Sequence, residues 1–161
     1  MKNLLLLSIV LVSGLCACSQ RVSPHDTVSN KNIKVTYGRP FKKGRETWGK
    51  LVPYGEVYRL GADEATTITF KNDGSFGGKP VKAGTYTLFA VPTEKNWTLI
   101  LNGQLGQWGA YDYEKNKIKD VLKVEVVPHS LEKSVEEFTI RFEGNNLLIE
   151  WDKVQASVPV S

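Results

Sequence analysis

The sequence predicts an all-β protein: a single antiparallel β-sandwich, jelly-roll-like or a partly open barrel, with roughly eight or nine strands and little or no helix. Three observations support this prediction. Apolar and polar residues alternate with a period of two from Ile33 onward. Turn-forming residues interrupt the alternating runs about every 8–12 residues. Beyond the first segment of the chain, no stretch shows the 3.6-residue apolar period of an amphipathic helix.

The expected strands follow one another in chain order. Residues 18–32 are either a polar tether or include a first edge strand near Thr27-Val28, and the alternation that begins at Ile33 predicts the next strand. Further strands are expected at 66–70, 86–91, 97–101, 122–126, 138–142, 147–151 and 154–160. In each of them alternate positions share a face, so a slip of one residue would expose the apolar set. Residues 130–137 are the one candidate for a helical turn.

Residues that tolerate a positive φ stand between the alternating runs. Such residues are typical of the tight turns that connect antiparallel strands. They are Asp73-Gly74, Gly77-Gly78, Ala83-Gly84, Asn102-Gly103 and Gly144-Asn145-Asn146.

The first 17 residues are typical of a lipoprotein signal peptide. Lys2 supplies a positive charge, and residues 4–15 form an apolar run that is too short to span a bilayer as a mature helix. Cys18 follows, with Ala17 and Leu15 at the positions that a bacterial lipobox requires. Cleavage before Cys18 and acylation of that residue would hold the domain at an envelope membrane, in the periplasm or at the cell surface. Plain secretion or a short uncleaved anchor is the alternative.

Removal of residues 1–17 leaves 144 of the 161 residues (161 − 17), which is enough for one domain. Residues 18–32 would then carry the acylated cysteine and the tether or edge strand, and residues 33–161 would form the β-sandwich. Cleavage removes Cys16 and acylation uses Cys18, so the mature fold is expected to contain no disulfide and to depend on its core.

Composition excludes several classes of function. The 21 basic and 17 acidic residues give a net charge of +4, which is too mild and too mixed to indicate nucleic-acid binding. Two cysteines and two histidines exclude a Cys/His zinc cage, and no spacing supports another metal site. No glycine-rich phosphate loop precedes a helix. We therefore expect no nucleic-acid partner, no metal and no cofactor.

Charge is unevenly distributed along the chain. Residues 31–50 contain seven basic residues and one acidic residue, whereas residues 132–152 contain six acidic and two basic residues. We interpret the two stretches as separate solvated surfaces on opposite ends or edges of the domain, where charge also deters strand-to-strand aggregation.

Residues 37–64 do not alternate and form a long connection for a compact β domain. Long ordered connections of this kind are often functional. Arg39, Arg45 and Arg59 are separated by glycines and prolines, so the chain can fold back and bring their guanidinium groups together to bind a carboxylate or phosphate. The alternative is that each arginine ties the loop to backbone carbonyls or pairs with an acidic residue of the same connection.

Aromatic residues supply possible walls for such a cleft. Trp48, Tyr54 and Trp108 are the expected walls, and Glu64 completes the expected lining. Trp108 stands among aromatic and planar polar residues in 107–113, a composition that also suits stacking against a sugar ring. The alternative is that the tryptophans cap the ends of the core.

Several short runs of the chain resemble a known family. They are Ser23-Pro24-His25, Tyr37-Gly38-Arg39-Pro40, Lys43-Gly44-Arg45, Trp48-Gly49, Leu51-Val52-Pro53-Tyr54-Gly55, Arg59, Gly61-Ala62-Asp63-Glu64-Ala65-Thr66-Thr67, Lys82-Ala83-Gly84-Thr85-Tyr86, Trp97-Thr98, Trp108-Gly109 and Glu150-Trp151. In this order they closely resemble the domain-of-unknown-function 2911 (DUF2911) family of exported bacterial proteins, over essentially the whole mature chain. The resemblance implies a single all-β domain and an exported location, and no reaction. Relatives often read Gly-Ala-Asn-Glu where this chain has Asp63, so a role that needs an amide donor there is in doubt.

Three functional hypotheses follow. The first is an envelope-anchored, non-catalytic binding or accessory module that takes a small anionic ligand or a glycan in the arginine cleft. The second is a hydrolase or lyase in which Glu64 or His25 acts as general base while an arginine stabilises developing negative charge. The third is a structural partner in an envelope protein complex, docked through its edge strands or its basic stretch.

Overall fold

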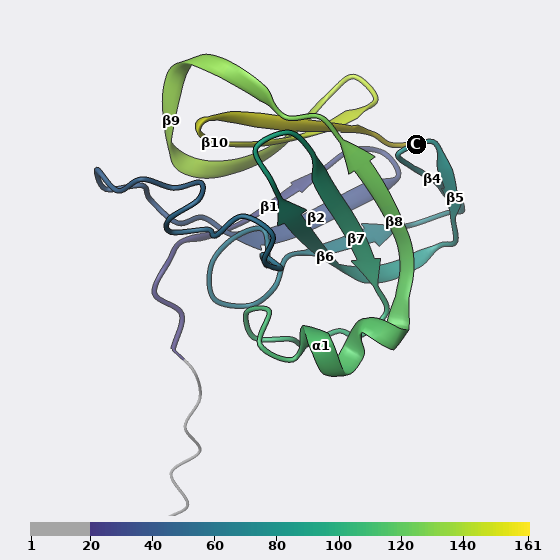
Figure 1. Cartoon of the computed structure of the whole chain (residues 1–161). Helices are drawn as coiled ribbons and strands as arrows, with labels where there is room; N and C mark the ends of the chain where they lie inside the picture. Colours follow the sequence, from purple (N-terminus) through teal and green to yellow (C-terminus); the bar gives the residue numbers. More distant parts are fainter. Residues whose placement is uncertain (1–19) are drawn as a thin grey trace, which may run out of the picture.

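The computed structural model describes residues 20–161 (Figure 1). The expected signal peptide and Cys18 lie outside the described residues and stay predictions. The described chain contains one helix, α1 (Tyr113–Asn116), which a 3-10 turn (Lys117–Lys119) follows directly. Its ten strands are β1 (His25–Ser29), β2 (Ile33–Gly38), β3 (Thr67–Phe70), β4 (Gly74–Phe76), β5 (Lys79–Val81), β6 (Gly84–Pro92), β7 (Trp97–Asn102), β8 (Asp120–Val126), β9 (His129–Glu143) and β10 (Asn146–Pro159).

Two layers of antiparallel sheet enclose the core. The larger sheet has six strands in the order β1-β2-β3-β6-β7-β8, and β9 and β10 form a long hairpin that lies across it (Figure 1). The small β4–β5 hairpin lies beside the C-terminus (Figure 1). The all-β prediction is therefore confirmed. The large sheet keeps two free edges, β1 and β8, and does not close into a barrel.

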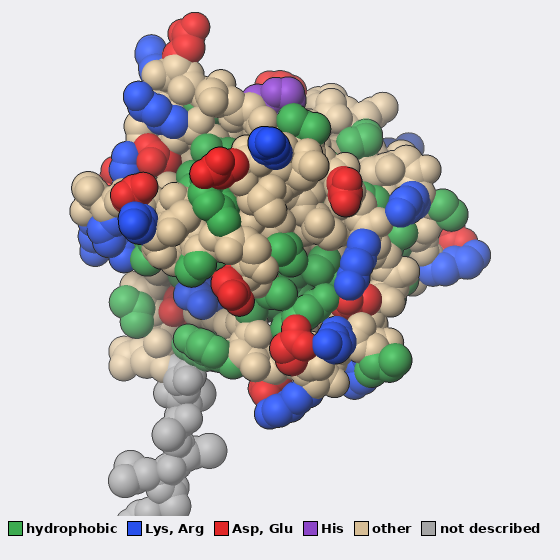
Figure 2. Space-filling model, viewed as in Figure 1, with side chains coloured by type: hydrophobic (Ala, Val, Ile, Leu, Met, Phe, Trp, Pro, Cys, Tyr) green, Lys and Arg blue, Asp and Glu red, His purple; other side chains and the backbone are tan. Residues whose placement is uncertain are grey.

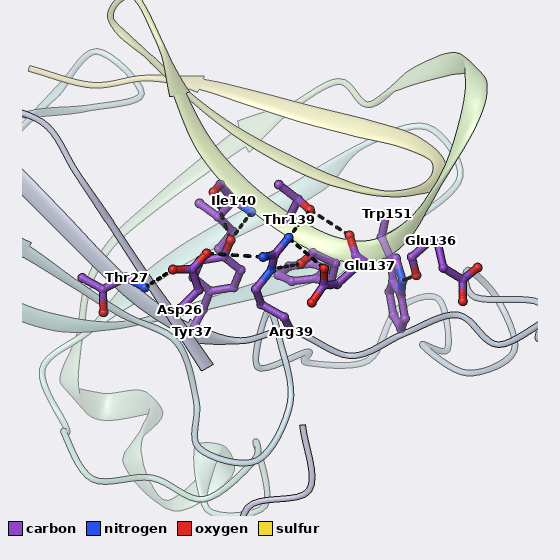
Figure 3. Close-up of polar contacts among 10 residues, drawn as sticks. Asp26, Thr27, Tyr37, Arg39, Glu136, Glu137, Thr139, Ile140 and Trp151 are labelled. Carbon is purple, nitrogen blue, oxygen red and sulfur yellow. Dashed lines mark hydrogen bonds and ion pairs between the residues drawn. The ribbon is translucent and has the colours of Figure 1, made fainter. Parts of the chain in front are cut away.

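The alternating pattern places apolar side chains between the two layers. In β2, Ile33, Val35 and Tyr37 are buried while Lys34 is exposed. The Tyr37 hydroxyl also links the layers, because it donates to the carbonyl oxygen of Ile140 at 3.1 Å and accepts from that residue's amide at 2.9 Å (Figure 3). One buried tyrosine therefore fixes β2 against β9.

The strands differ from the sequence prediction in three places. Residues 147–151 and 154–160, expected as two strands, belong to the single strand β10, whose register with β9 shifts on both sides of Asp152. Asp152 has a φ of 53°, and an irregularity of this kind interrupts the alternation without ending the strand. Residues 130–137 form part of β9 rather than a helical turn. The β4–β5 hairpin, which has no alternating run long enough to predict it, brings the total to ten.

The chain start contains an edge strand, one of its two expected forms, and the long connection folds back on itself as expected. Residues 18–32 include an edge strand, since β1 pairs with β2 along its whole length. The connection between β2 and β3 returns to its own beginning: a Cβ at Gly38 would lie 2.2 Å from the carbonyl oxygen of Ala62. Only glycine permits this approach, so Gly38 closes the loop.

An aromatic cluster holds the middle of the long connection in the core. The Trp48 ring lies 4.5 Å from the Trp97 ring and about 6 Å from the rings of Tyr58 and Trp151, centroid to centroid. Its indole nitrogen donates to the carbonyl oxygen of Trp151 at 3.1 Å. Trp48 is therefore a core residue that fastens the connection to β10.

The basic and acidic stretches face each other, so their interpretation as separate surfaces is wrong. Arg39 pairs with Glu137 at 3.2 Å, and Lys42 pairs with Asp152 at 2.5 Å. The backbone amide of Lys43 donates to Glu136 at 2.7 Å. The charges that are segregated in the sequence hold the first half of the long connection against the β9–β10 hairpin.

Candidate functional site

The long connection folds around a cleft of about 620 Å³. This volume is within the usual range for sites that bind small molecules. The cleft is lined by the chain start at residues 22–24 and by the two arms of the connection, 40–45 and 51–63, with Trp151 contributing from β10. Segments far apart in the sequence therefore meet here.

Arg59 lines this cleft with unused hydrogen-bonding capacity. Its Nε is buried and has no partner, and no hydrogen bond or ion pair of its side chain is found within residues 20–161. Its Nη1 lies close to Gly109, 3.5 Å from the point where a Cβ would stand. Burial raises the pKa of the adjacent Tyr58, whose hydroxyl donates to the Gly61 carbonyl at 3.1 Å, so this tyrosine stays neutral.

Other charged groups stand around the same cleft. Lys43 and Arg45 contribute positive charge, and Glu56 and Asp63 contribute negative charge. Arg45 ties its own loop, because its Nε donates to the carbonyl of Lys42 at 2.9 Å and its Nη2 to the carbonyl of Phe41 at 2.6 Å. The cleft thus brings Arg45 and Arg59 together, with Arg45 partly committed to the backbone.

Arg39 lies outside the cleft lining and is fully engaged (Figure 3). Its guanidinium group pairs with Asp26 at 3.4 Å and with Glu137 at 3.2 Å, and it donates to the Phe138 carbonyl at 3.3 Å and to the Thr139 hydroxyl at 3.1 Å. The three expected arginines therefore do not converge. Arg39 joins β1, the connection and β9.

Glu64 lies in a separate groove of about 210 Å³ with Arg21 and His25. Arg21 Nε donates to both carboxylate oxygens, at 2.8 and 3.0 Å, and His25 Nε2 lies 3.0 Å from the second. Burial acts to raise the pKa of Glu64. Its own backbone amide, the hydrogen bond from Arg21 and the charges of Arg21 and His25 together outweigh burial and lower this pKa.

His25 is held between two acceptors. Its Nδ1 lies 3.1 Å from the carbonyl oxygen of Ser23, and its Nε2 faces the Glu64 carboxylate. Both contacts are hydrogen bonds at the same time only when both ring nitrogens carry a proton. His25 and Glu64 thus form a clamp on the chain start.

Asp63 completes this clamp. Its Oδ2 accepts from the backbone amides of Val22 and Ser23 at 3.2 and 3.1 Å. Asp63 has a φ of 62°, a left-handed conformation that Asp and Asn tolerate better than most residues. We call residues 21–25 the strap. Asp63 and Glu64 hold the strap, which forms one wall of the 620 Å³ cleft.

The expected aromatic walls lie elsewhere. Trp48 is in the core, and Tyr54, which is exposed, packs over Gly49. Trp108 is half-buried and makes an isolated β-bridge with Glu64. None of the three lines the 620 Å³ cleft.

Comparison with known proteins agrees with the resemblance seen in the sequence. Residues 19–160 match the model of a family described as protein of unknown function, DUF2911. The chain belongs to this family. No curated protein and no solved structure matches the chain. In this DUF2911 protein, the runs from Tyr37 to Pro40 and from Gly61 to Glu64 lie at the two ends of the connection that builds the cleft.

Two further properties of this DUF2911 protein concern partners. Over residues 20–161 no group of three or more His, Cys, Asp and Glu side chains is arranged to hold a metal ion. In the same range no helix has the length and apolar character that crossing a membrane requires.

Sequence reasoning missed the strap and Trp151 as parts of the cleft. Nothing in the local pattern of Val22, Ser23 and Pro24 marks them as a wall, because the contacts that place them come from residues about 40 positions later. The adjacent acids Asp63 and Glu64 were the available signal. In the structure both carboxylates accept hydrogen bonds from the strap.

Proposed function

We propose that this protein is a non-catalytic binding module, held at an envelope membrane through acylated Cys18, that takes a small organic anion in the 620 Å³ cleft. The observation that supports the proposal is Arg59, a cleft residue whose buried Nε has no partner in the described chain. A buried donor without an acceptor is costly to the fold, by about 1–3 kcal/mol. A carboxylate or phosphate in the cleft would accept from the Nη groups of the same side chain, which are not fully buried and make no hydrogen bond within residues 20–161.

The charges around Arg59 favour an anion. The lining contains three basic residues, Lys43, Arg45 and Arg59, against two acidic ones, Glu56 and Asp63, and the Asp63 carboxylate already accepts two strap amides. A guanidinium group binds a carboxylate or phosphate through paired hydrogen bonds that are stronger than those to neutral groups. The acidic group of the ligand would therefore lie against Arg59.

The walls favour an aliphatic body on the ligand over a sugar ring. Much of the lining is aliphatic, with Val22, Leu51, Val52 and Val57 among its members. Its aromatic members are Phe41, Tyr58 and Trp151, and the rings of Tyr58 and Trp151 are packed against Trp48 in the aromatic cluster. Tyr54 and Trp108, the aromatic residues expected to stack on a sugar, lie outside the lining. Of the two ligand classes expected from the sequence, the anion is the one that these walls suit.

Thermal unfolding with a panel of anions tests this proposal. Short and medium-chain carboxylates, alkyl phosphates and neutral sugars would be compared at low and high salt. A ligand at about 100 times its Kd stabilises the fold by about 2.7 kcal/mol. We expect stabilisation by acids with an aliphatic tail, weaker at high salt, and none by sugars.

Arg59→Gln is the decisive variant, and Lys34→Gln is its control. Lys34 is exposed on β2 and absent from the cleft lining, so the control removes the same charge elsewhere. Arg59→Gln should abolish the stabilisation, whereas Lys34→Gln should preserve it. Equal stabilisation of both variants, or none of the wild-type protein by any anion, would contradict the proposal.

The catalytic hypothesis has weaker support. Glu64 accepts from Arg21 and faces His25, and its lowered pKa makes it a poorer base. Arg59, the arginine with free donors, lines the other cleft. The third hypothesis, a structural role in an envelope complex, stays a prediction.

A further inference from the structure

The segment between β7 and β8 exposes several large apolar side chains. Ile118 is 87% exposed and Tyr111 is 79% exposed, and Leu105 and Val121 are exposed as well. Single exposed apolar residues are ordinary on a soluble domain, but a group of them on one projecting segment indicates a contact surface. In Figure 1 this segment, with α1, forms the lower end of the molecule.

The helical segment carries apolar side chains towards the core and towards solvent. The amide of Tyr113 donates to the carbonyl oxygen of Ala110 at 3.1 Å, and α1 continues directly into the 3-10 turn. Tyr113 is buried, with its ring 5.3 Å from the Phe89 ring. Tyr111, just before α1, and Ile118, in the 3-10 turn, are exposed. The segment therefore turns one apolar residue inward and leaves two others in solvent.

Hydrogen bonds bring Leu105 to the same place. The amide of Gly103 donates to the carbonyl oxygen of Lys119 at 2.9 Å, and the Lys119 ammonium group donates to the side chain of Gln104. The loop that carries Leu105 is therefore fastened to the end of the 3-10 turn, next to Ile118.

The start of the described chain lies beside this segment. The amide of Gly109 donates to the carbonyl oxygen of Asp63 at 2.9 Å, and the Asp63 side chain accepts from the amides of Val22 and Ser23. Arg21 and Gly106 line the same groove. Val22 is itself 89% exposed. Cys18 stands four residues before Val22, so an extended chain reaches at most about 14 Å between them.

We propose that Val22, Leu105, Tyr111 and Ile118, which we call the apolar tip, lie in the interface of the membrane that holds the acyl chains of Cys18. This inference rests on the lipid anchor of the proposed function. Apolar and aromatic side chains are typical of surfaces that insert into the boundary between headgroups and acyl chains. Figure 2 shows hydrophobic side chains at this end, interleaved with charged ones.

Insertion of the apolar tip depends on apolar contact more than on net charge. The charges of this segment are balanced: Lys115 pairs with Asp112 at 2.8 Å and Lys117 with Glu114 at 2.7 Å, while Lys119 donates to the Gln104 side chain and is followed by Asp120. The segment therefore has no large excess of positive charge to attract anionic lipid. We expect the tip to contact zwitterionic and anionic bilayers alike.

The proposed orientation also places the cleft next to the bilayer. Val22 belongs both to the apolar tip and to the lining of the 620 Å³ cleft. An amphiphilic acid leaving the outer part of the bilayer would therefore meet the cleft within a side chain's length of the surface.

Fluorescence quenching by membrane-embedded nitroxides tests the orientation. The full chain, produced with its own leader and purified in detergent, would be reconstituted into vesicles of phosphatidylethanolamine and phosphatidylglycerol. A thiol-reactive, environment-sensitive fluorophore would be attached to Ile118→Cys and, as the matched control, to Asn145→Cys. Asn145 is exposed in the β9–β10 turn, at the other end of the domain (Figure 1). Wild-type protein carried through the labelling measures any reaction at Cys16 or Cys18.

We expect nitroxides on the acyl chains to quench the label at position 118 at least threefold more than the label at position 145. Equal, weak quenching at both positions while the protein floats with the vesicles would overturn the apolar tip and leave the anchor in place. A label at 118 that is shielded from water but not quenched by lipid would also overturn it, in favour of a protein contact. Failure to float with the vesicles would overturn the anchor and, with it, the tip.

Discussion

Arg39 and Arg59 stand towards opposite ends of one connection and have opposite surroundings. The Arg39 guanidinium group reaches two carboxylates, a carbonyl and a hydroxyl, contributed by β1 and β9. The buried Nε of Arg59 reaches none. The same residue type therefore serves as scaffold at one end and as unused binding capacity at the other. Hydrogen-bond satisfaction, not residue type or position in a motif, separates the two roles.

The contrast extends to the two halves of the connection. The first half is held by ion pairs to the β9–β10 hairpin and by Trp48 in the aromatic cluster. The second arm, residues 51–63, contributes ten of the eighteen residues that line the cleft. We therefore expect substitutions in the first half to change stability and substitutions in the second half to change binding.

The largest expected effect is at Trp48, in the first half. Trp48→Ala removes a ring in contact with Trp97 and Trp151 and should destabilise the fold by about 3–5 kcal/mol, the usual cost of emptying a buried aromatic site. Tyr54→Ala, six residues later and exposed, should cost less than about 1 kcal/mol. Urea unfolding measures both. Similar losses for the two variants would remove the distinction between core and surface aromatics that the structure draws.

The next effect separates the two arginines directly. Arg39→Gln leaves Asp26 and Glu137 facing each other without the charge between them and should cost about 1.5–3 kcal/mol. Arg59→Gln removes a buried donor that has no partner, so it should cause no loss of stability and should recover some of the about 1–3 kcal/mol that such a donor costs. The same unfolding experiment, run on both variants without ligand, decides this. A loss at Arg59 equal to the loss at Arg39 would mean that Arg59 is also scaffold.

Most of the fold could be predicted from the sequence because strands are a local property. The runs at 97–101 and 138–142 alternate and lie in β7 and β9, and the edge strand near Thr27-Val28 is β1. Residues 147–160 were divided wrongly because the bulge at Asp152 interrupts the alternation within one strand. An alternating pattern predicts which face of the sheet a residue occupies, but it does not predict whether the strand continues beyond an irregularity.

The site could be predicted only in outline. The long connection was identified correctly as the irregular region, and Arg45 and Arg59 do line one cleft. The positions of Arg39, Trp48 and Glu64 depend on partners more than 20 residues away, such as Glu137, Trp151 and Arg21. Unlike alternation, such pairings leave no local signal. The charge segregation between residues 31–50 and 132–152 is the exception: it is visible in the sequence, and it reflects attraction between the two stretches rather than separation.

The smallest expected effect concerns the strap, which closes the cleft from the side of the chain start. Ionised Glu64 holds Arg21 and His25, and its pKa is lower in the fold than its ordinary value near 4.5. A carboxyl group with a lowered pKa stabilises the fold above its unfolded pKa and loses that contribution as pH falls through the folded pKa. Glu64→Gln should therefore cost about 0.5–1 kcal/mol at pH 7, a value limited by solvent screening of this half-exposed pair.

The difference between wild type and Glu64→Gln should be fully present above the ordinary pKa of a glutamate and should shrink as pH falls through the lowered pKa of Glu64, because the wild-type carboxyl is then protonated too. Trypsin gives a readout specific to the strap, because cleavage after Arg21 at neutral pH should be faster in the variant, as followed by mass spectrometry. A stability difference that does not shrink as the solution is acidified would assign the effect to packing rather than to the ion pair. Faster cleavage together with unchanged anion binding would show that the strap, although it lines the cleft, does not hold the ligand, and that Arg59 and the second arm of the connection suffice.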